Sequence, residues 1–227
     1  MAAQAVRADL LSAIIPALNA EAHLGACLDA LKEADELVVV DGGSSDYTIE
    51  IAERRGARLL CAATGRGHQL CAGADAADGD WFLFLHADTR LAEGWRTEVD
   101  RHIAASPGKA ACFRFRLDAA VWQARLIERG VMARSRLLGL PYGDQGLLIS
   151  RSLYEEVGGY RPLPLMEDVD FVRRLGPARL HVLGAIATTS AGRWLRDGWF
   201  RRSASNLALL ILYRLGMSPA KLASLYR

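Results

Sequence analysis

Acidic side chains follow three segments of this chain in positions where they could bind a cation and accept a proton. Asp41 ends a run of β-branched residues, Asp88 with His86 follows an aromatic and leucine-rich run, and Glu167-Asp168 follows a proline-rich segment. Hard divalent cations prefer oxygen ligands and often take further ones from substrate phosphates. A carboxylate can also remove the proton of an attacking hydroxyl. The pattern therefore indicates metal-diphosphate chemistry with acid–base assistance.

Each of these motifs also has a purely structural alternative. Asp41 could bond its own turn, and Asp88 could cap a helix. The imidazole of His86 suits Mn²⁺ better than Mg²⁺, but it also fits a buried histidine that binds no metal. Glu167 and Asp168 open a short helix, where the helix dipole favours acids. The residues alone leave these alternatives open.

Basic residues gather near the C-terminus. Residues 191–227 contain seven Lys or Arg against one acid, a local charge of +6 in a chain of net charge +2. Arginine pairs well with diphosphate oxygens, so Arg193 is a candidate for such a contact beside Trp194. The basic segment could meet a phosphate-bearing ligand or an acidic membrane, or simply face solvent. The low overall charge argues against nucleic-acid binding.

Composition predicts a globular protein of the cytoplasm. The 227 residues are 51% hydrophobic, enough for one cored domain. The four cysteines lack metal or redox spacing, as expected in a reducing compartment. Residues 1–9 lack an apolar signal core, and the longest apolar run, 207–212, is far below the ~20 residues of a membrane span. Contact at the inner membrane face stays open.

The motifs fall between alternating strand and helix signals. Strands are expected at 11–16, 37–40, 57–61, 81–85, 111–115 and 147–149, with edge strands at 181–183 and 187–189. Helices are expected from a cap at Asn19 to 31, from a cap at Asp46 to 56, and over 66–77, 121–138, 169–175 and 194–215. This alternation predicts an α/β fold with a mostly parallel central sheet flanked by helices and a helical C-terminal extension. Ligands of such sheets bind at the carboxyl ends of the strands.

Four motifs in this order resemble the family 2 glycosyltransferases of the GT-A (nucleotide-diphospho-sugar transferase) fold. Residues 13–21 (AIIPALNAE) are similar to the family's P-x-x-N-x-E turn, and 38–46 (VVVDGGSSD) to its nucleotide loop. His86-Ala87-Asp88 stands at the place of the D-x-D metal motif, and Glu167-Asp168 at that of the E-D base motif. The chain further resembles a small bacterial branch with F-L-H-A-D-T, G-D-Q-G, P-L-M-E-D and R-W motifs, which has been linked to arsenosugar biosynthesis.

The resemblance implies a role for each matching residue. Asp168 would be the general base with Glu167 beside it, Asp88 and His86 would hold Mg²⁺ or Mn²⁺, and Asp144 and Gln145 would lie near the acceptor. The residues implied for the nucleotide donor are Pro16, Asn19, Glu21, Asp41, Gly42, Ser44, Arg66, Arg193 and Trp194. The implied domain covers residues 1–190, with a nucleotide-binding half at about 10–90 and an acceptor half at about 91–190, followed by the extension 191–227.

The implied activity is sugar transfer with inversion, from a UDP-sugar to a hydroxyl acceptor, which the basic, leucine-rich C-terminus allows to be lipid-linked. A homodimer through that segment is also allowed. Three departures from the family pattern matter: His86 replaces the first metal-motif acid, Cys71 stands where many relatives have Asn, and Ser190 replaces the Gln of Q-x-x-R-W. The last argues against a processive synthase. Two alternatives remain: a nucleotidyltransferase, and a nucleotide-sugar-binding protein that has lost catalysis.

Overall fold

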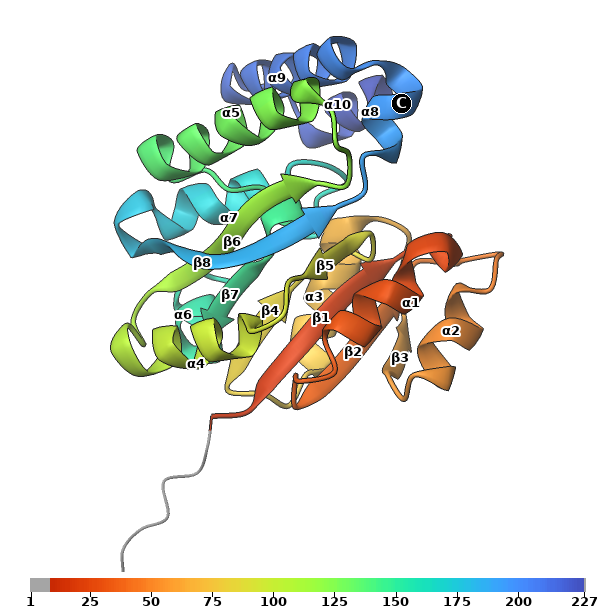
Figure 1. Cartoon of the computed structure of the whole chain (residues 1–227), viewed down its shortest axis with the longest axis vertical. Helices are drawn as coiled ribbons and strands as arrows, with labels where there is room; N and C mark the ends of the chain where they lie inside the picture. The colour runs from red at the N-terminus through yellow and green to blue at the C-terminus, as the bar shows by residue number, and fades with distance from the viewer. Residues whose placement is uncertain (1–8, 227) are drawn as a thin grey trace, which may run out of the picture.

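Eight strands form one twisted mixed sheet (Figure 1). This computed structural model describes residues 9–226; the segment 1–8, expected to carry no targeting sequence, and Arg227 lie outside the described residues. The strands are β1 (Leu11–Ala17), β2 (Glu36–Asp41), β3 (Arg58–Cys61), β4 (Trp81–Phe84), β5 (Thr89–Leu91), β6 (Ala110–Leu117), β7 (Leu147–Ser150) and β8 (Leu180–Thr189). Their order is β3-β2-β1-β4-β7-β6-β8-β5.

The sheet is mostly parallel, as predicted. The pairs β1–β2, β1–β4, β2–β3 and β6–β8 are parallel, whereas β4–β7, β6–β7 and β5–β8 are antiparallel. The N-terminal strands β1, β2 and β4 therefore end at a common edge, which carries Asp41 and the segment that contains Asp88.

Helices flank the sheet and form a block at one end of it (Figure 1). They are α1 (Glu21–Ala30), α2 (Thr48–Arg54), α3 (Arg66–Ala76), α4 (Trp95–Ala105), α5 (Trp122–Leu138), α6 (Arg151–Glu156), α7 (Glu167–Leu175), α8 (Gly192–Asp197), α9 (Trp199–Arg214) and α10 (Pro219–Leu225), with 3₁₀ turns at Gly143–Gln145 and Pro177–Arg179. No helix within residues 9–226 is long and apolar enough to cross a membrane.

Alternation along the strands divides the core between the two faces of the sheet. Ala13 and Ile15 of β1 pack with α1, α2 and α4, whereas Ile14 between them packs with α3, α6 and α7. A third cluster joins β6 to α5 and to Trp194 and Trp199 of the C-terminal helices. The C-terminal block is thus packed onto the second half of the sheet.

The structure differs from the prediction in four places. The helix α4 was not predicted. The expected edge strands 181–183 and 187–189 are one continuous strand, β8, because its pairing with β6 resumes after an irregularity between Cys112 and Arg114. The edge strand at that side is β5, whose three residues give too little periodicity to predict. The expected final helix 194–215 is broken at Gly198, which has a φ of 87°, and α10 follows separately.

Gly67 allows α3 to pack against the segment that leads into α7. A Cβ at this position would lie 2.5 Å from the carbonyl oxygen of Leu163 and 2.7 Å from that of Arg161. Backbone atoms cannot move aside as a flexible side chain can, so α3 or this segment would shift.

We expect Gly67→Ala to lower the free energy of unfolding by about 1–3 kcal/mol, the usual cost of overpacking. Gly130→Ala is the matched control, because Gly130 lies within α5 with no atom near its Cβ position. The control should gain up to about 1 kcal/mol from helix propensity. Urea unfolding of both variants checks this; equal stabilities would show that the contact with residues 161–163 does not constrain the fold.

Candidate active site

The loops that follow β1 and β2 are hydrogen-bonded to each other. The backbone N–H of Asn19 donates to Ser44 Oγ (2.8 Å), and Asn19 Oδ1 accepts from the N–H of Ser45 (2.9 Å). Glu21 Oε2 accepts from the N–H of Tyr47 (3.2 Å). Asn19 has a φ of 48°, so it does not cap α1 as predicted; the helix begins at Glu21, and the Asn19 amide binds the neighbouring loop instead.

Asp46, which was predicted to cap α2, is not the N-cap residue of that helix. The helix begins at Thr48 with Tyr47 as its N-cap residue. Asp46 Oδ1 nevertheless accepts from the N–H of Thr48 (3.0 Å), so its carboxylate stabilises the turn into the helix.

Asp41 keeps one carboxylate oxygen for its own loop and leaves the other without a partner. Its Oδ2 accepts from the N–H groups of Gly43 (2.8 Å) and Ser44 (2.9 Å), whereas buried Oδ1 has no hydrogen-bond partner among the described residues. Because an unsatisfied buried acceptor is costly, this oxygen is suited to a donor group on a ligand. The interpretation that Asp41 bonds its own turn is thus confirmed, whereas its contact with a ligand stays a prediction.

Gln69 ties the ends of β1 and β2 together, and sequence reasoning missed it. Its buried Nε2 donates to the carbonyl oxygens of Ala17 (2.7 Å) and Val40 (2.8 Å), and its amide lies against Gly42. The helical spacing offered an indication of this role, because Gln69 is the one polar side chain among the buried residues of α3.

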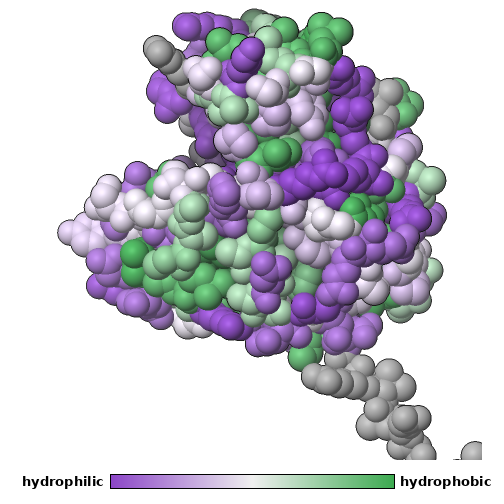
Figure 2. Space-filling view, turned by 180° about the vertical axis from the view of Figure 1, so that it is seen from behind, coloured by the Kyte–Doolittle hydropathy of each residue, from purple (hydrophilic) through white to green (hydrophobic). Residues whose placement is uncertain are grey.

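Two adjoining cavities lie at this edge. A groove of about 560 Å³ runs past Pro16 and Asn19, and an inner cavity of about 130 Å³ lies between the E-D motif and α9. Arg66, Asp88 and Arg193 are among the residues that line both. From behind, the outline is indented between the C-terminal block and the body of the molecule (Figure 2). The cavities thus form one continuous candidate site.

Most of the predicted site residues converge here. The groove is lined by Pro16, Asn19, Arg66, His86, Asp88 and Arg193, and the inner cavity by Arg66, His86, Asp88, Asp144, Glu167, Asp168, Arg193 and Trp194. Glu21, Asp41, Gly42, Ser44 and Gln145 line neither of them. Glu21, Asp41, Gly42 and Ser44 lie in or next to the hydrogen-bonded loops that follow β1 and β2.

Arg66 and Glu167 form an ion pair at the floor of the site. Arg66 Nη1 lies 3.2 Å from Glu167 Oε1, and the Glu167 side chain is 2% exposed. Burial raises the pKa of Glu167, although Arg66 opposes this. Burial would lower the pKa of Arg66, but Glu167 and Asp168 outweigh it, so the net pKa of Arg66 is raised. The guanidinium is therefore firmly charged and offsets the negative charge of the motif.

Asp168 is held at the first turn of α7. Its Oδ2 accepts from the N–H of Gly143 (2.9 Å) and its Oδ1 from that of Val169 (2.7 Å). Met166, just before the helix, has a φ of 67°, which is rare for a side chain of this size. A strained residue beside the E-D motif is typical of a functional turn. The constraint fixes where the Asp168 carboxylate meets the inner cavity.

Asp144 and Gln145, predicted together, lie in different environments. Asp144 lines the inner cavity, and burial with the nearby charges of Asp168 and Asp88 raises its pKa to about 6. Gln145 is fully buried, where its Oε1 accepts from Ser135 Oγ (2.7 Å) and its Nε2 donates to the Phe113 carbonyl (3.1 Å). Gln145 therefore anchors the turn that presents Asp144.

His86 faces Arg66 within the site. Its Nε2 lies 3.3 Å from Arg66 Nη1, and burial, Arg66 and Arg193 keep the pKa of His86 well below its ordinary value. The ring is neutral, and its Nε2 accepts from the guanidinium. Within residues 9–226 no three His, Cys, Asp or Glu side chains are grouped to hold a metal ion. Asp88, which lines both cavities, fits a cation that takes its remaining ligands from donor phosphates.

Sequence reasoning also missed residues from distant segments. Tyr226, after α10, lines both cavities, and its hydroxyl accepts from Arg193 Nη1 (3.2 Å) and from Arg202. Tyr142 lines the inner cavity with Arg134 stacked 3.5 Å from its ring centre. Tyr142 was detectable as the residue before G-D-Q-G, whereas Tyr226 is not part of any motif in the sequence.

The sheet, its flanking helices and the acidic edge define a GT-A fold, and comparisons with known proteins agree. A family model for glycosyl transferase family 2 matches residues 12–139, more than half of the chain. The chain therefore belongs to glycosyl transferase family 2.

Solved structures share this fold. Staphylococcus aureus TarS 1-349 aligns with a TM-score of 0.65 at 16% identity over 94% of this chain and 68% of that one. Glucosyl-3-phosphoglycerate synthase from Mycobacterium tuberculosis, in complex with Mn²⁺ and UDP-glucose, aligns with a TM-score of 0.58 at 22% identity over 81% and 70%.

Curated relatives match over a shorter stretch. A PGL/p-HBAD biosynthesis glycosyltransferase of Mycobacterium tuberculosis is 43% identical over 38% of this chain and 38% of its own length. An uncharacterized glycosyltransferase of Haemophilus influenzae is 32% identical over 37% and 38%. The chain thus spans about two fifths of the length of these relatives.

The raised pKa of Asp144 predicts a pH-dependent stability. The folded state holds this proton up to about pH 6, whereas the ordinary pKa is 3.8. Folding therefore loses stability through this group as pH rises from about 4 to 6, and the loss is complete above that range. Asp144→Asn cannot ionise, so its free energy of unfolding relative to the wild type should increase across this interval. Urea unfolding at several pH values measures the difference; parallel profiles would contradict the environment described for Asp144.

Proposed function

We propose that the chain transfers a sugar, with inversion, from a UDP-sugar to a hydroxyl group of an acceptor. The observation that carries this proposal is the convergence of Asp88, Asp144 and Asp168 with Arg66 and Arg193 around one pair of cavities. Residues up to 190 would form the catalytic domain, with the donor half at about 10–90, and the helices after residue 190 would close the site.

The donor fits the groove. Its base and ribose would lie near Pro16 and Asn19, and the base would have to reach past this lining to the buried Oδ1 of Asp41, which has no partner among the described residues. Its diphosphate would meet Arg66 and Arg193, since guanidinium groups bind phosphate oxygens well. Support for a UDP-sugar comes from structures of the same fold, including TarS in complex with UDP-GlcNAc.

A divalent cation, Mg²⁺ or Mn²⁺, fits beside Asp88. Burial raises the pKa of Asp144, and the nearby carboxylates of Asp168 and Asp88 raise it further while Arg134 opposes them, so a cation beside these three side chains would stabilise their charged forms. When bound, the cation would act as a Lewis acid that neutralises charge on the departing diphosphate. His86 is the weaker candidate as a ligand because its Nε2 already accepts from Arg66.

Asp168 is the proposed base. It lines the inner cavity, where hydrogen bonds from the backbone N–H groups of Gly143 and Val169 fix the position of its carboxylate. It would take the proton of the acceptor hydroxyl as that oxygen attacks the anomeric carbon, while the diphosphate leaves toward Arg66 and Arg193. Glu167, paired with Arg66, positions that arginine. Positioning and fixed charges would supply most of the rate.

The inner cavity suits an acceptor with several polar groups. Tyr142 Oη, Asp144 Oδ1 and Trp194 Nε1 are buried beside it without a hydrogen-bond partner among the described residues. An acceptor that carries hydroxyls could satisfy all three. This supports Asp144 as an acceptor-side residue, and it favours the acceptor side for Trp194 as well, which the resemblance had implied for the donor. Membership of the arsenosugar-linked branch stays a prediction.

A nucleotide-sugar-binding protein without turnover is the second candidate, favoured by His86 in the metal motif and its contact with Arg66. The products separate the possibilities. Sugar transfer releases a nucleoside diphosphate, nucleotidyl transfer releases pyrophosphate, and a binding protein releases neither. A screen of UDP-, GDP- and dTDP-sugars with Mn²⁺ therefore tests the proposal directly.

Asp168→Asn should lower kcat by at least about 100-fold, the usual contribution of a general base. UDP affinity, measured by calorimetry, should stay within about two-fold, because the amide keeps the size of the side chain. Transfer at the wild-type rate would exclude Asp168 as the base.

Asp170→Asn is the matched control in the same turn of α7. Asp170 pairs with Arg161 (3.3 Å) and Arg174 (2.8 Å) and lines neither cavity. The control should lower the Tm while kcat, measured well below the Tm, stays unchanged.

Metal dependence of UDP binding provides the other test. UDP at about 100 times its Kd should stabilise the wild type by about 2.7 kcal/mol with Mn²⁺ present, and EDTA should remove most of that gain. Asp88→Asn should bind UDP weakly in both conditions. An equal shift with Mn²⁺ and with EDTA would favour the non-catalytic binding protein.

A further inference from the structure

The outer side of α5 exposes an apolar stripe. Trp122, Leu126 and Leu137 occur at spacings that place them along one side of the helix, and Leu137 is 81% exposed. The buried side of the same helix carries Ala124 and packs on β6. A helix that packs its inner face normally presents polar residues outward, so this stripe needs an explanation.

The outer side of α9 continues this stripe. Phe200 contacts Trp122 with ring centres 6.0 Å apart, and the two helices lie side by side in the C-terminal block (Figure 1). Together the exposed residues define the α5–α9 face: Trp122, Leu126, Leu137, Phe200, Leu207, Ile211 and Leu215, from 48% exposed at Ile211 to 81% at Leu137. Both helices thus contribute to one apolar surface.

Arginines border this face. A groove of about 240 Å³ between β6 and α5 is lined by Arg114 and Arg116 of the strand and by Arg129 and Arg136 of the helix. Their side chains form no ion pair or hydrogen bond within the described residues, and the one acid of the groove, Glu128, is paired with Arg125. Four uncompensated charges around one groove favour an anionic ligand.

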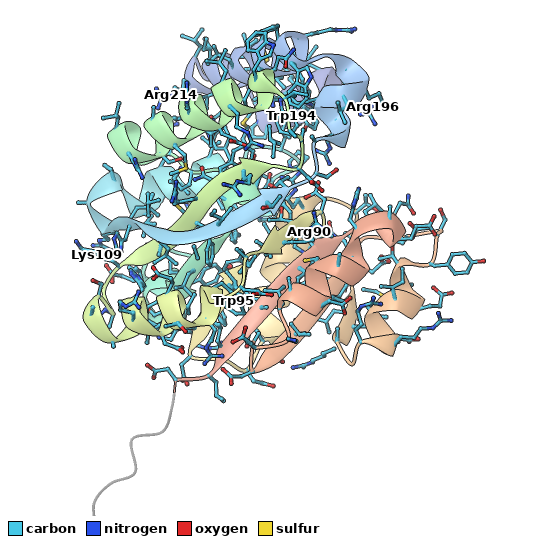
Figure 3. All side chains as sticks on the ribbon, viewed as in Figure 1. Arg90, Trp95, Lys109, Trp194, Arg196 and Arg214 are labelled. Carbon is cyan, nitrogen blue, oxygen red and sulfur yellow. The ribbon has the colours of Figure 1, made fainter. Side chains whose placement is uncertain are left out.

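Further basic residues lie at the ends of the same block. Arg196 and Arg214 lie at its opposite ends (Figure 3). In the view from behind, apolar and polar residues are interspersed over it (Figure 2). Cationic side chains therefore surround the apolar face on several sides.

We propose that the α5–α9 face docks onto an anionic phospholipid membrane, with lipid phosphates bound in the arginine groove. An exposed apolar helix face bordered by arginines is what an interfacial helix needs, because the apolar side chains enter the lipid boundary while the cations meet the headgroups. Two exposed apolar helices lying side by side would insert together.

A second copy of the chain fits this face less well. A two-fold interface uses the same patch on both partners, so each copy would bring four uncompensated arginines to the interface or its border. Like charges would then approach without acids to separate them, because Glu128 is already paired. An anionic surface removes this repulsion.

The docked face would lie directly over the candidate active site. Leu207 and Ile211 of α9 are exposed, whereas Leu209 and Leu210 line the inner cavity. One helix thus separates the proposed membrane surface from the cavity. Docking does not depend on the proposed catalysis. Loss of vesicle binding would therefore contradict the docking proposal alone, and absence of sugar transfer would contradict the proposed function alone.

Vesicle co-sedimentation of the full chain tests the proposal. The protein should bind vesicles of equal parts phosphatidylglycerol and phosphatidylcholine, bind pure phosphatidylcholine vesicles at least about ten-fold more weakly, and dissociate near 0.5 M salt. The double variant Arg129→Gln/Arg136→Gln should lose about 25-fold in partitioning, from about five-fold per arginine. Leu126→Ser/Leu137→Ser should lose at least about ten-fold.

Lys32→Gln/Arg54→Gln is the matched control, since it removes two exposed charges, one from the turn after α1 and one from α2, away from the C-terminal block (Figure 1). It should bind vesicles as the wild type does, and circular dichroism should show all variants folded. Equal loss in the control, or full binding by either test variant, would overturn the proposal. So would an inorganic-phosphate thermal shift without vesicle binding, or a dimer in sedimentation that Leu126→Ser/Leu137→Ser dissociates.

Discussion

The compensation of buried negative charge by Arg66 is the interaction on which the site depends. Four acidic side chains, Asp88, Asp144, Glu167 and Asp168, line a small cavity, and burial together with the charges of Asp168 and Asp88 raises the pKa of Asp144. Without a cation among them, the low-dielectric interior would favour protonation of these carboxylates, or the cavity would open to water. Arg66 supplies that cation from the start of α3, and Gly67 next to it lets the helix approach the segment before α7. The charge balance and the close packing are thus parts of one arrangement.

The first half of the chain could be predicted well from its sequence, because each strand there is a short apolar run that ends in a turn signal. β1, β2, β3 and β4 begin and end within one residue of the expected positions, and Asp41 and Asp88 follow strands as parallel topology requires. The second half was less predictable. β8 was expected as two separate edge strands, 181–183 and 187–189, but pairing with β6 makes them one strand that includes Gly184. Tertiary pairing overrode the local signal.

The site was predictable to the extent that its residues belong to local motifs. His86, Asp88, Glu167 and Asp168 were expected together, and they line one cavity. Gln145 belongs to the same kind of motif, yet its side chain points into the core, because neighbouring residues on a tight turn face different ways. Tyr226 could not be found at all, since only the packing of α10 brings it to the cavity. Sequence motifs therefore identify the side chains proposed to carry the chemistry better than the other residues that line the cavity.

The ring of Tyr226 has a mechanical consequence for the two cavities. It borders both, and its hydroxyl bridges Arg193 and Arg202, so neither space can be reshaped without affecting the other. A molecule that needs the volume of this ring must first break its contacts with both guanidinium groups. Arg202 would keep its ion pair with Asp197 (3.4 Å), whereas Arg193 would lose the hydrogen bond to the phenol. Because Tyr226 lines both cavities, a change in the position of its ring alters the volume of both at once.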